Sequence, residues 1–183
     1  MNKTILFATL LSFSYLSFAQ HKHSNYVGED KRIIKSLSDE DIQNLQEGSG
    51  MGLAKAAELN HYPGPKHVLD NADELQLSDE QKFSTEKFFR SMHEEAVRLG
   101  NLIIEKEQTL DSLFANSLIT QTSLKSELDE IAQLRSQLRF THLHAHLEMK
   151  NILSEKQIAK YDELRGYVSQ KKMKNHQTNK TNR

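Results

Sequence analysis

The chain has 183 residues, of which 24 are basic and 25 acidic, and it contains no cysteine. The balanced charge, without a basic stripe, argues against DNA or RNA as a partner. The lack of cysteine excludes disulfides, thiolate metal ligands, a lipid-modified cysteine and a cysteine nucleophile. A chain of this length accommodates one domain with tails.

The N-terminus predicts export. Residues 1–19 contain one lysine, an apolar run from Ile5 to Phe18, and small residues at Ser17 and Ala19. This is the pattern of a secretory signal peptide that is cleaved after Ala19. An uncleaved anchor is the alternative, but the apolar run is short for a membrane span. We therefore expect an exported, soluble mature chain.

Polar segments flank the predicted core at both ends. Residues 20–32 and residues 170–183 have few apolar side chains with which to dock on a folded domain. We expect a flexible arm at the first and a disordered polar tail at the second. The arm carries His21 and His23, which we interpret as part of a polar spacer rather than as a metal site.

Residues 33–75 predict an N-terminal helical cap. Ser38 and Asp41 have the spacing of a helix start, and the segment holds both prolines of the chain. The GSGMG stretch at 48–52 has the glycine content of a phosphate-binding loop. However, no strand precedes it and no Lys-Ser or Lys-Thr follows it, so we interpret it as a turn.

Residues 76–169 predict a long antiparallel helical hairpin. Apolar residues recur at three- and four-residue spacing from 78 to about 115, and again from about 120 to 153. The connection between them, NSLITQT, is short, which makes the two helices antiparallel neighbours. Because the chain shows no strand-like alternation, the predicted fold class is all-α.

A five-residue motif marks two helix starts. LSDEQ, which contains Ser78 and Gln81, returns later in the chain as LSEKQ, which contains Ser154 and Gln157. In such a motif the serine accepts a hydrogen bond from the backbone three residues on, and the glutamine side chain reaches back to the serine backbone. The motifs therefore predict the beginning of the hairpin and of a short C-terminal helix.

The second long helix has two apolar faces. Leu138, Ala145 and Met149 form one face, and Phe140, Leu143 and Leu147 form the other. A helix with two apolar faces needs two packing partners, and a hairpin with a short cap covers little of them. We therefore expect a homodimer or a larger assembly.

The histidines suggest a metal site. If the chain folds back at the connection, His93 lies level with residues 141–149. His142, His146 and Met149 stand at positions i, i+4 and i+7, on one face of one helix, where two imidazoles can share an ion. Imidazoles with a thioether suit Zn, Cu, Ni or Co better than Ca or Mg.

A structural interpretation of the same residues is also open. His93 and His142 could hydrogen-bond across the hairpin or to Glu94 and Arg139, and Met149 could fill the core. Glu94 could instead add an oxygen ligand. Spacing alone favours the structural interpretation. Neither a nucleophile elbow nor a cleft with paired acids is indicated, so we do not expect an enzyme.

The two LSxxQ motifs on an exported hairpin resemble those of the Spy/CpxP superfamily of periplasmic proteins. That superfamily is named for an LTXXQ motif and includes heavy-metal resistance and sensor relatives. The resemblance covers about residues 75–168. HLHAHLEMKNILSEKQIAKYD, which begins at His142, is similar to the metal-sensor branch, in which a His and a nearby Met precede the final motif. His146 and Met149 are the matching residues, although the family places its His four residues before the Met, where this chain has Ala145.

The resemblance implies a non-enzymatic periplasmic stress protein of one of two kinds. The first is a transition-metal-binding sensor or resistance protein, whose ion shifts a helical arrangement that a membrane-anchored signalling protein reads. The second is an ATP-independent chaperone, a dimeric cradle for unfolded client proteins. The histidine cluster favours the first kind, and the two apolar faces are compatible with the second.

Overall fold

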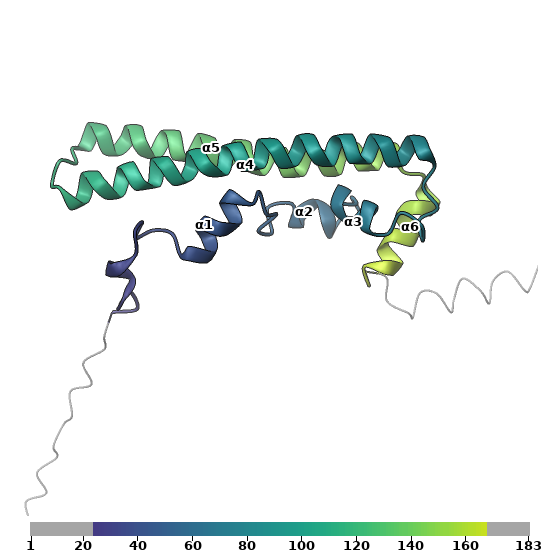
Figure 1. The fold of residues 1–183 in the computed structure, drawn as a ribbon, viewed down its shortest axis with the longest axis horizontal. Coiled ribbons are helices and arrows are strands. Elements are labelled where there is room, and N and C mark those ends of the chain that lie inside the picture. Colours follow the sequence, from purple (N-terminus) through teal and green to yellow (C-terminus); the bar gives the residue numbers. More distant parts are fainter. Residues whose placement is uncertain (1–23, 168–183) are drawn as a thin grey trace, which may run out of the picture.

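The computed structural model describes residues 24–167, and this part of the chain is built of helices without a strand (Figure 1). The elements are η1 (Glu29–Lys31), α1 (Asp39–Gln46), α2 (Lys55–Glu58), α3 (Pro65–Asp70), α4 (Asp79–Ala115), α5 (Gln121–Ile152) and α6 (Glu155–Leu164). The predicted signal peptide (1–19), the first residues of the arm and the tail (170–183) lie outside the described residues. None of the helices just named has the length and apolar character needed to cross a membrane.

The hairpin of α4 and α5 is the main body of the fold. The two helices run side by side along nearly their whole length (Figure 1). The N-cap side chain of Ser78 begins α4 and that of Thr120 begins α5, each with a capping box. Ser117, with a positive φ of 56°, closes the connection. The hairpin and the all-α class are therefore as the periodicity of the sequence predicts.

The N-terminal segment lies along one face of the hairpin, as Figure 1 shows. Helix α1 packs on α4, α2 packs on α5, and α3 contacts both long helices. Where α1 covers the hairpin, a first core cluster forms from Ile34, Leu37, Leu45, Ala96, Leu99, Ile103 and Leu138. This arrangement gives the thin hairpin the apolar cover that it lacks by itself.

Gly100 allows the closest approach between α1 and α4. A Cβ atom at this position would overlap the carbonyl oxygen of Leu45. Glycine in a helix interior is unfavourable by about 0.5–1 kcal/mol relative to alanine. Its presence here is explained by the backbone of α1, which occupies the space that a side chain would need.

Helix α6 covers the open end of the hairpin, where α4 begins and α5 ends. The extended backbone of Leu153 separates α5 from α6, and Ser154 with Gln157 forms the capping box of α6. Here a second core cluster forms from Val68, Leu75, Met149, Leu153, Ile158 and Tyr161. The short C-terminal helix is therefore confirmed, and it is part of the core rather than an appendage.

The two LSxxQ motifs also contact each other. The side-chain amide of Gln81 donates to Oε1 of Gln157 at 3.0 Å, and the amide of Gln157 donates to Oε1 of Gln81 at 2.9 Å. Each amide donates in addition to a backbone carbonyl, that of Ile152 for Gln81 and that of Leu75 for Gln157. The sequence predicts two caps, and the tertiary structure joins them into one polar link.

Residues 24–32 are the part of the predicted arm that the structure describes. They form turns and the one-turn helix η1, and Arg32 pairs with Glu29 at 3.1 Å. Further along, Lys35 pairs with Asp111 of α4 at 3.1 Å. These contacts place the start of the cap against the hairpin.

Candidate metal-binding groove

A groove of about 630 Å³ lies between the cap, α4 and α5. We call it the histidine groove, because His67, His93, His142 and His146 line it. The cap contributes residues 47–52, 54–55, 58–59 and 64–67, including the glycine turn at 48–52, and Arg165 and Tyr167 follow from the C-terminal end of α6. The groove therefore occupies the stretch of the hairpin where the helical cover of α1 has ended.

His142 is buried without a hydrogen-bond partner. Its side chain comes from α5, and the residue is only 4% exposed. Within the described part of the chain, its buried Nε2 atom has no partner. Burial, together with the nearby imidazoles of His146 and His93, lowers the pKa of His142 below its usual 6.5. His142 is therefore a neutral imidazole at neutral pH, with an uncommitted nitrogen.

His146 is held in one tautomer by the cap. Its Nδ1 lies 2.7 Å from the carbonyl oxygen of Tyr62. Because a carbonyl can only accept, Nδ1 carries a proton, and in the neutral imidazole Nε2 is then the nitrogen with the lone pair. A metal-ligating histidine commonly donates its other ring nitrogen in this way. Gly64 lies against the ring, where a Cβ would come within 3.0 Å of Cε1 and 3.2 Å of Nε2.

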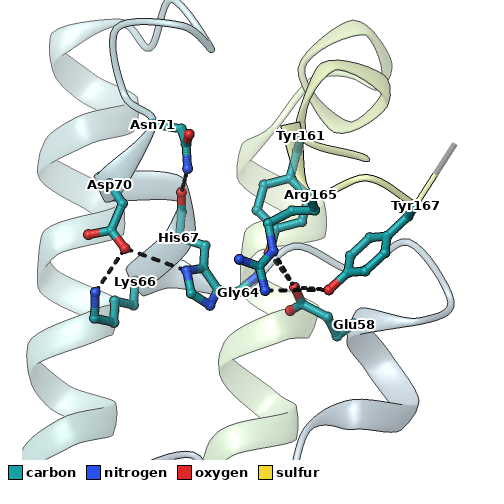
Figure 2. Close-up of polar contacts among 9 residues, drawn as sticks. All are labelled: Glu58, Gly64, Lys66, His67, Asp70, Asn71, Tyr161, Arg165 and Tyr167. Carbon is teal, nitrogen blue, oxygen red and sulfur yellow. Dashed lines mark hydrogen bonds and ion pairs between the residues drawn. The ribbon is translucent and has the colours of Figure 1, made fainter. Parts of the chain in front are cut away.

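Glu58 lies beside His146 and is held in place by residues of α6 and the segment that follows it. Figure 2 shows Tyr161, Arg165 and Tyr167 converging on its carboxylate. Oε1 accepts hydrogen bonds from the hydroxyls of Tyr161 (2.8 Å) and Tyr167 (2.9 Å) and from Nε of Arg165 (3.1 Å). Its other oxygen, Oε2, lies 3.8 Å from Nδ1 of His146. Glu58 thus links α2 to α6 and faces the protonated side of the His146 ring.

The same network sets the ionisation of Glu58. Burial by itself would raise the pKa of this carboxyl group, but the hydrogen bonds from Tyr161 and Tyr167 and the charge of Arg165 outweigh it and lower the pKa. Burial raises the pKa of Tyr161 far above its usual 10.0. Tyr161 also accepts from the backbone N–H of Gly64 at 3.2 Å. Glu58 is therefore a charged positioning residue whose Oε1 accepts three hydrogen bonds.

His93 reaches the groove from α4. Its ring stacks on Phe89 with 5.9 Å between ring centroids, and the residue is exposed. It lies close enough to His142 to affect the pKa of that residue. The hairpin thus brings His93 level with His142 and His146, as the position of the turn predicts. His93 is therefore the exposed neighbour of two buried imidazoles.

Met149 does not join the three histidines. It is fully buried in the second core cluster and does not line the groove. This is the core-filling role that the alternative interpretation gives it. Glu94 also lies elsewhere, in a shallow surface depression beside Phe83. Of the four predicted ligands, His93, His142 and His146 therefore line the groove, and Met149 does not.

Sequence reasoning missed several contributors to the groove. Glu58, Tyr62 and Gly64 come from the cap, and their contacts with His146 follow from how the cap lies on α5. The two prolines that flank Gly64 were the only sequence signal for this contact, because they predict a turn at this point of the cap. Met51 and Met92 also line the groove, and spacing along a single helix could not connect them.

The histidines are not arranged as a closed coordination shell. Over residues 24–167, no three or more His, Asp or Glu side chains stand close enough together to hold one ion. To hold one ion through all three imidazoles, the exposed His93 side chain of α4 would therefore have to move toward His142 and His146. Comparison of the chain with protein-family models, with curated proteins and with solved structures finds no match.

Proposed function

We propose that the protein is a non-enzymatic, exported, periplasmic transition-metal-binding protein of the sensor or resistance type, and that His142, His146 and His93 hold the ion. The observation that carries this proposal is the buried, unpartnered Nε2 of His142. A buried polar atom without a hydrogen bond costs about 1–3 kcal/mol. An ion that binds this nitrogen would explain why a histidine occupies the buried position.

The surroundings of His146 support the same proposal. Its Nδ1–H is committed to Tyr62, so that its free nitrogen is the one suited to an ion. Tyr62 and Glu58 connect this ring to the turn before α3 and to α6. A change at the ion would therefore be felt at α6, where a membrane-anchored signalling partner could read it. The resemblance of the two LSxxQ motifs to the Spy/CpxP superfamily agrees with this function.

Calorimetric titration with Zn, Cu, Ni and Co tests the proposal. We expect binding of at least one of these ions to be at least tenfold weaker in the His142→Ala/His146→Ala double variant, because two ligands are removed. The matched control is His144→Ala, since His144 is exposed, stacks on Phe140 and pairs with Glu148. Equal affinity in the wild type and the double variant would exclude the site.

A second function, an ATP-independent chaperone, is favoured by a different observation. Phe140 and Leu147 on the outer face of α5 are 64% and 49% exposed. Exposed apolar side chains of this kind can hold an unfolded client or a second copy of the chain. Replacing both by Ser should abolish suppression of client aggregation if this function holds. Light scattering at about 10 µM, where interfaces of ordinary affinity are populated, should then also show a homodimer become a monomer.

A further inference from the structure

The histidine groove contains thioether sulfur as well as imidazole nitrogen. Met51 and Met92 line the same groove as His142 and His146. Met51 belongs to the glycine turn of the cap, and Met92 belongs to α4. Three separate segments of the chain thus bring soft, uncharged donors to one place.

The glycine turn packs against α4 and brings Met51 to the groove. Gly48 packs so tightly on α4 that a Cβ there would come within 3.0 Å of the Val97 side chain. Met51 also borders a second cavity together with Leu138, one helical turn before His142 on α5. The turn therefore places Met51 over the stretch of α5 that leads into the histidines.

The backbone of Met51 is also unusual. Its φ is 43°, a left-handed value that is uncommon for a residue other than glycine, and the side chain is 41% exposed. A strained residue that presents an apolar side chain at a groove suggests a functional role. The role that suits a methionine here is that of a sulfur donor.

Met92 faces the groove from the opposite helix. It precedes Ala96 by four residues and Leu99 by seven, and both of these are fully buried. It therefore lies on the inward-facing stripe of α4, where it is half-buried. His93, the next residue, supplies the imidazole from the same helix.

The charges around the groove do not favour a doubly charged ion. Glu47 and Glu58 line it, but so do Lys55, Lys66 and Arg165. Glu58 already accepts three hydrogen bonds at one oxygen, and Glu47 accepts one from Gln43 at 2.8 Å. The imidazole and thioether donors of the groove are themselves neutral. Among the first-row metals, thioether donors suit Cu(I), and imidazole suits copper as well.

We infer that the histidine groove binds a soft monovalent ion, Cu(I), in preference to Zn, Ni or Co, and that Met92 and Met51 complete the ligand set beside the imidazoles of the proposed site, His142, His146 and His93. This inference rests on the proposed metal-binding function and names the ion for the same site. Silver(I) has the same charge and ligand preference and undergoes no redox change under the conditions of a titration. It is therefore the probe for a first experiment.

The experiment compares Ag(I) and Zn(II) binding in a chloride-free buffer, with Cu(I) measured by competition against a colorimetric Cu(I) chelator. The test variant is Met51→Leu/Met92→Leu, which conserves volume and apolar character. Its control is Met149→Leu, the same chemical change in the second core cluster. We expect Ag(I) and Cu(I) to bind at least tenfold more tightly than Zn(II) in the wild type. We expect the double variant to lose at least tenfold in Ag(I) and Cu(I) affinity, and the control to lose less than twofold.

A second readout is the methionine methyl NMR spectrum. Addition of Ag(I) should shift the methyl signals of Met51 and Met92 and leave that of Met149 in place. Binding of Zn, Ni or Co that depends on the histidines but not on Met51 and Met92, with no preference for Ag(I), overturns this inference and leaves the proposed function standing. If no ion binds in a histidine-dependent way, both fall.

Discussion

The interface between α4 and α5 differs along its length. Around Leu99 and Ile103 it is apolar and covered by α1. Around His142 and His146 it is lined with imidazoles and borders the histidine groove. Both stretches belong to the same pair of long helices. The cover changes between them, from the helix α1 to the glycine turn at 48–52 and the short helices that follow it. The difference suggests that the first stretch serves stability and the second serves a ligand.

The largest expected effect on stability comes from the apolar stretch under α1. Leu99→Ala should lower the free energy of unfolding by about 2–5 kcal/mol, because Leu99 is fully buried in the first core cluster. Leu118→Ala, at the exposed connection of the hairpin, is the control and should stay within about 0.5 kcal/mol. Chemical denaturation measures both. Similar losses in the two variants would contradict the assignment of the core.

The polar link between the two LSxxQ motifs should rank next. Gln81→Ala and Gln157→Ala should each cost about 1–3 kcal/mol, since each removes a cap hydrogen bond and the mutual bonds between the two glutamine side chains. The double variant should cost less than the sum of the two, with a coupling of about 0.5–3 kcal/mol in a double-mutant cycle. Additive losses would mean that the motifs act only as separate caps.

Gly100→Ala tests how closely α1 approaches the hairpin. The overlap with the Leu45 carbonyl should cost about 1–3 kcal/mol, and the better helix propensity of alanine should return up to about 1 kcal/mol. A net loss of about 1–2 kcal/mol in a thermal or denaturant melt is expected. Gly50→Ala is the control, because a Cβ there meets nothing within 4 Å. The groove lies beyond this contact, so ion binding should survive the substitution.

His142→Leu should have the smallest effect on stability, and it should stabilise the protein where the other substitutions destabilise it. Removing a buried nitrogen that has no partner should leave the protein as stable at pH 7 as before, or more stable by about 1 kcal/mol. The pKa of His142 is lower in the folded than in the unfolded chain, so the unfolded state binds more protons below about pH 6.5. Above that pH the histidine therefore carries no protonation cost, and as the pH falls below it the free energy of unfolding of the wild type decreases.

The variant should therefore gain on the wild type as the pH is lowered from 7 to 5. Denaturation midpoints at several pH values measure this difference. A loss of stability on His142→Leu at pH 7 would instead assign His142 to the core, and the contrast between the two stretches of the interface would disappear.

Local patterns in the sequence determined the helices of this protein. Apolar spacing predicted α4 and α5, and the serine and glutamine pairs predicted where α4 and α6 begin, because capping and amphipathicity depend on residues three or four apart. The position of the turn also placed His93 level with His142 and His146. These features are short-range, or they follow from one fold-back of a regular hairpin.

The tertiary structure decided which residues meet at the groove and at the end of the hairpin. Met149 is a ligand candidate by spacing, but it is buried because α6 and the cap close over that side of α5. The cap folds back along the hairpin. Only for this reason does Met51 line the groove, and do Tyr62 and Glu58 lie beside His146. The mutual bond of Gln81 and Gln157 likewise joins residues that are distant in the chain. Contacts of this kind depend on how separate elements pack, which periodicity within one helix does not specify.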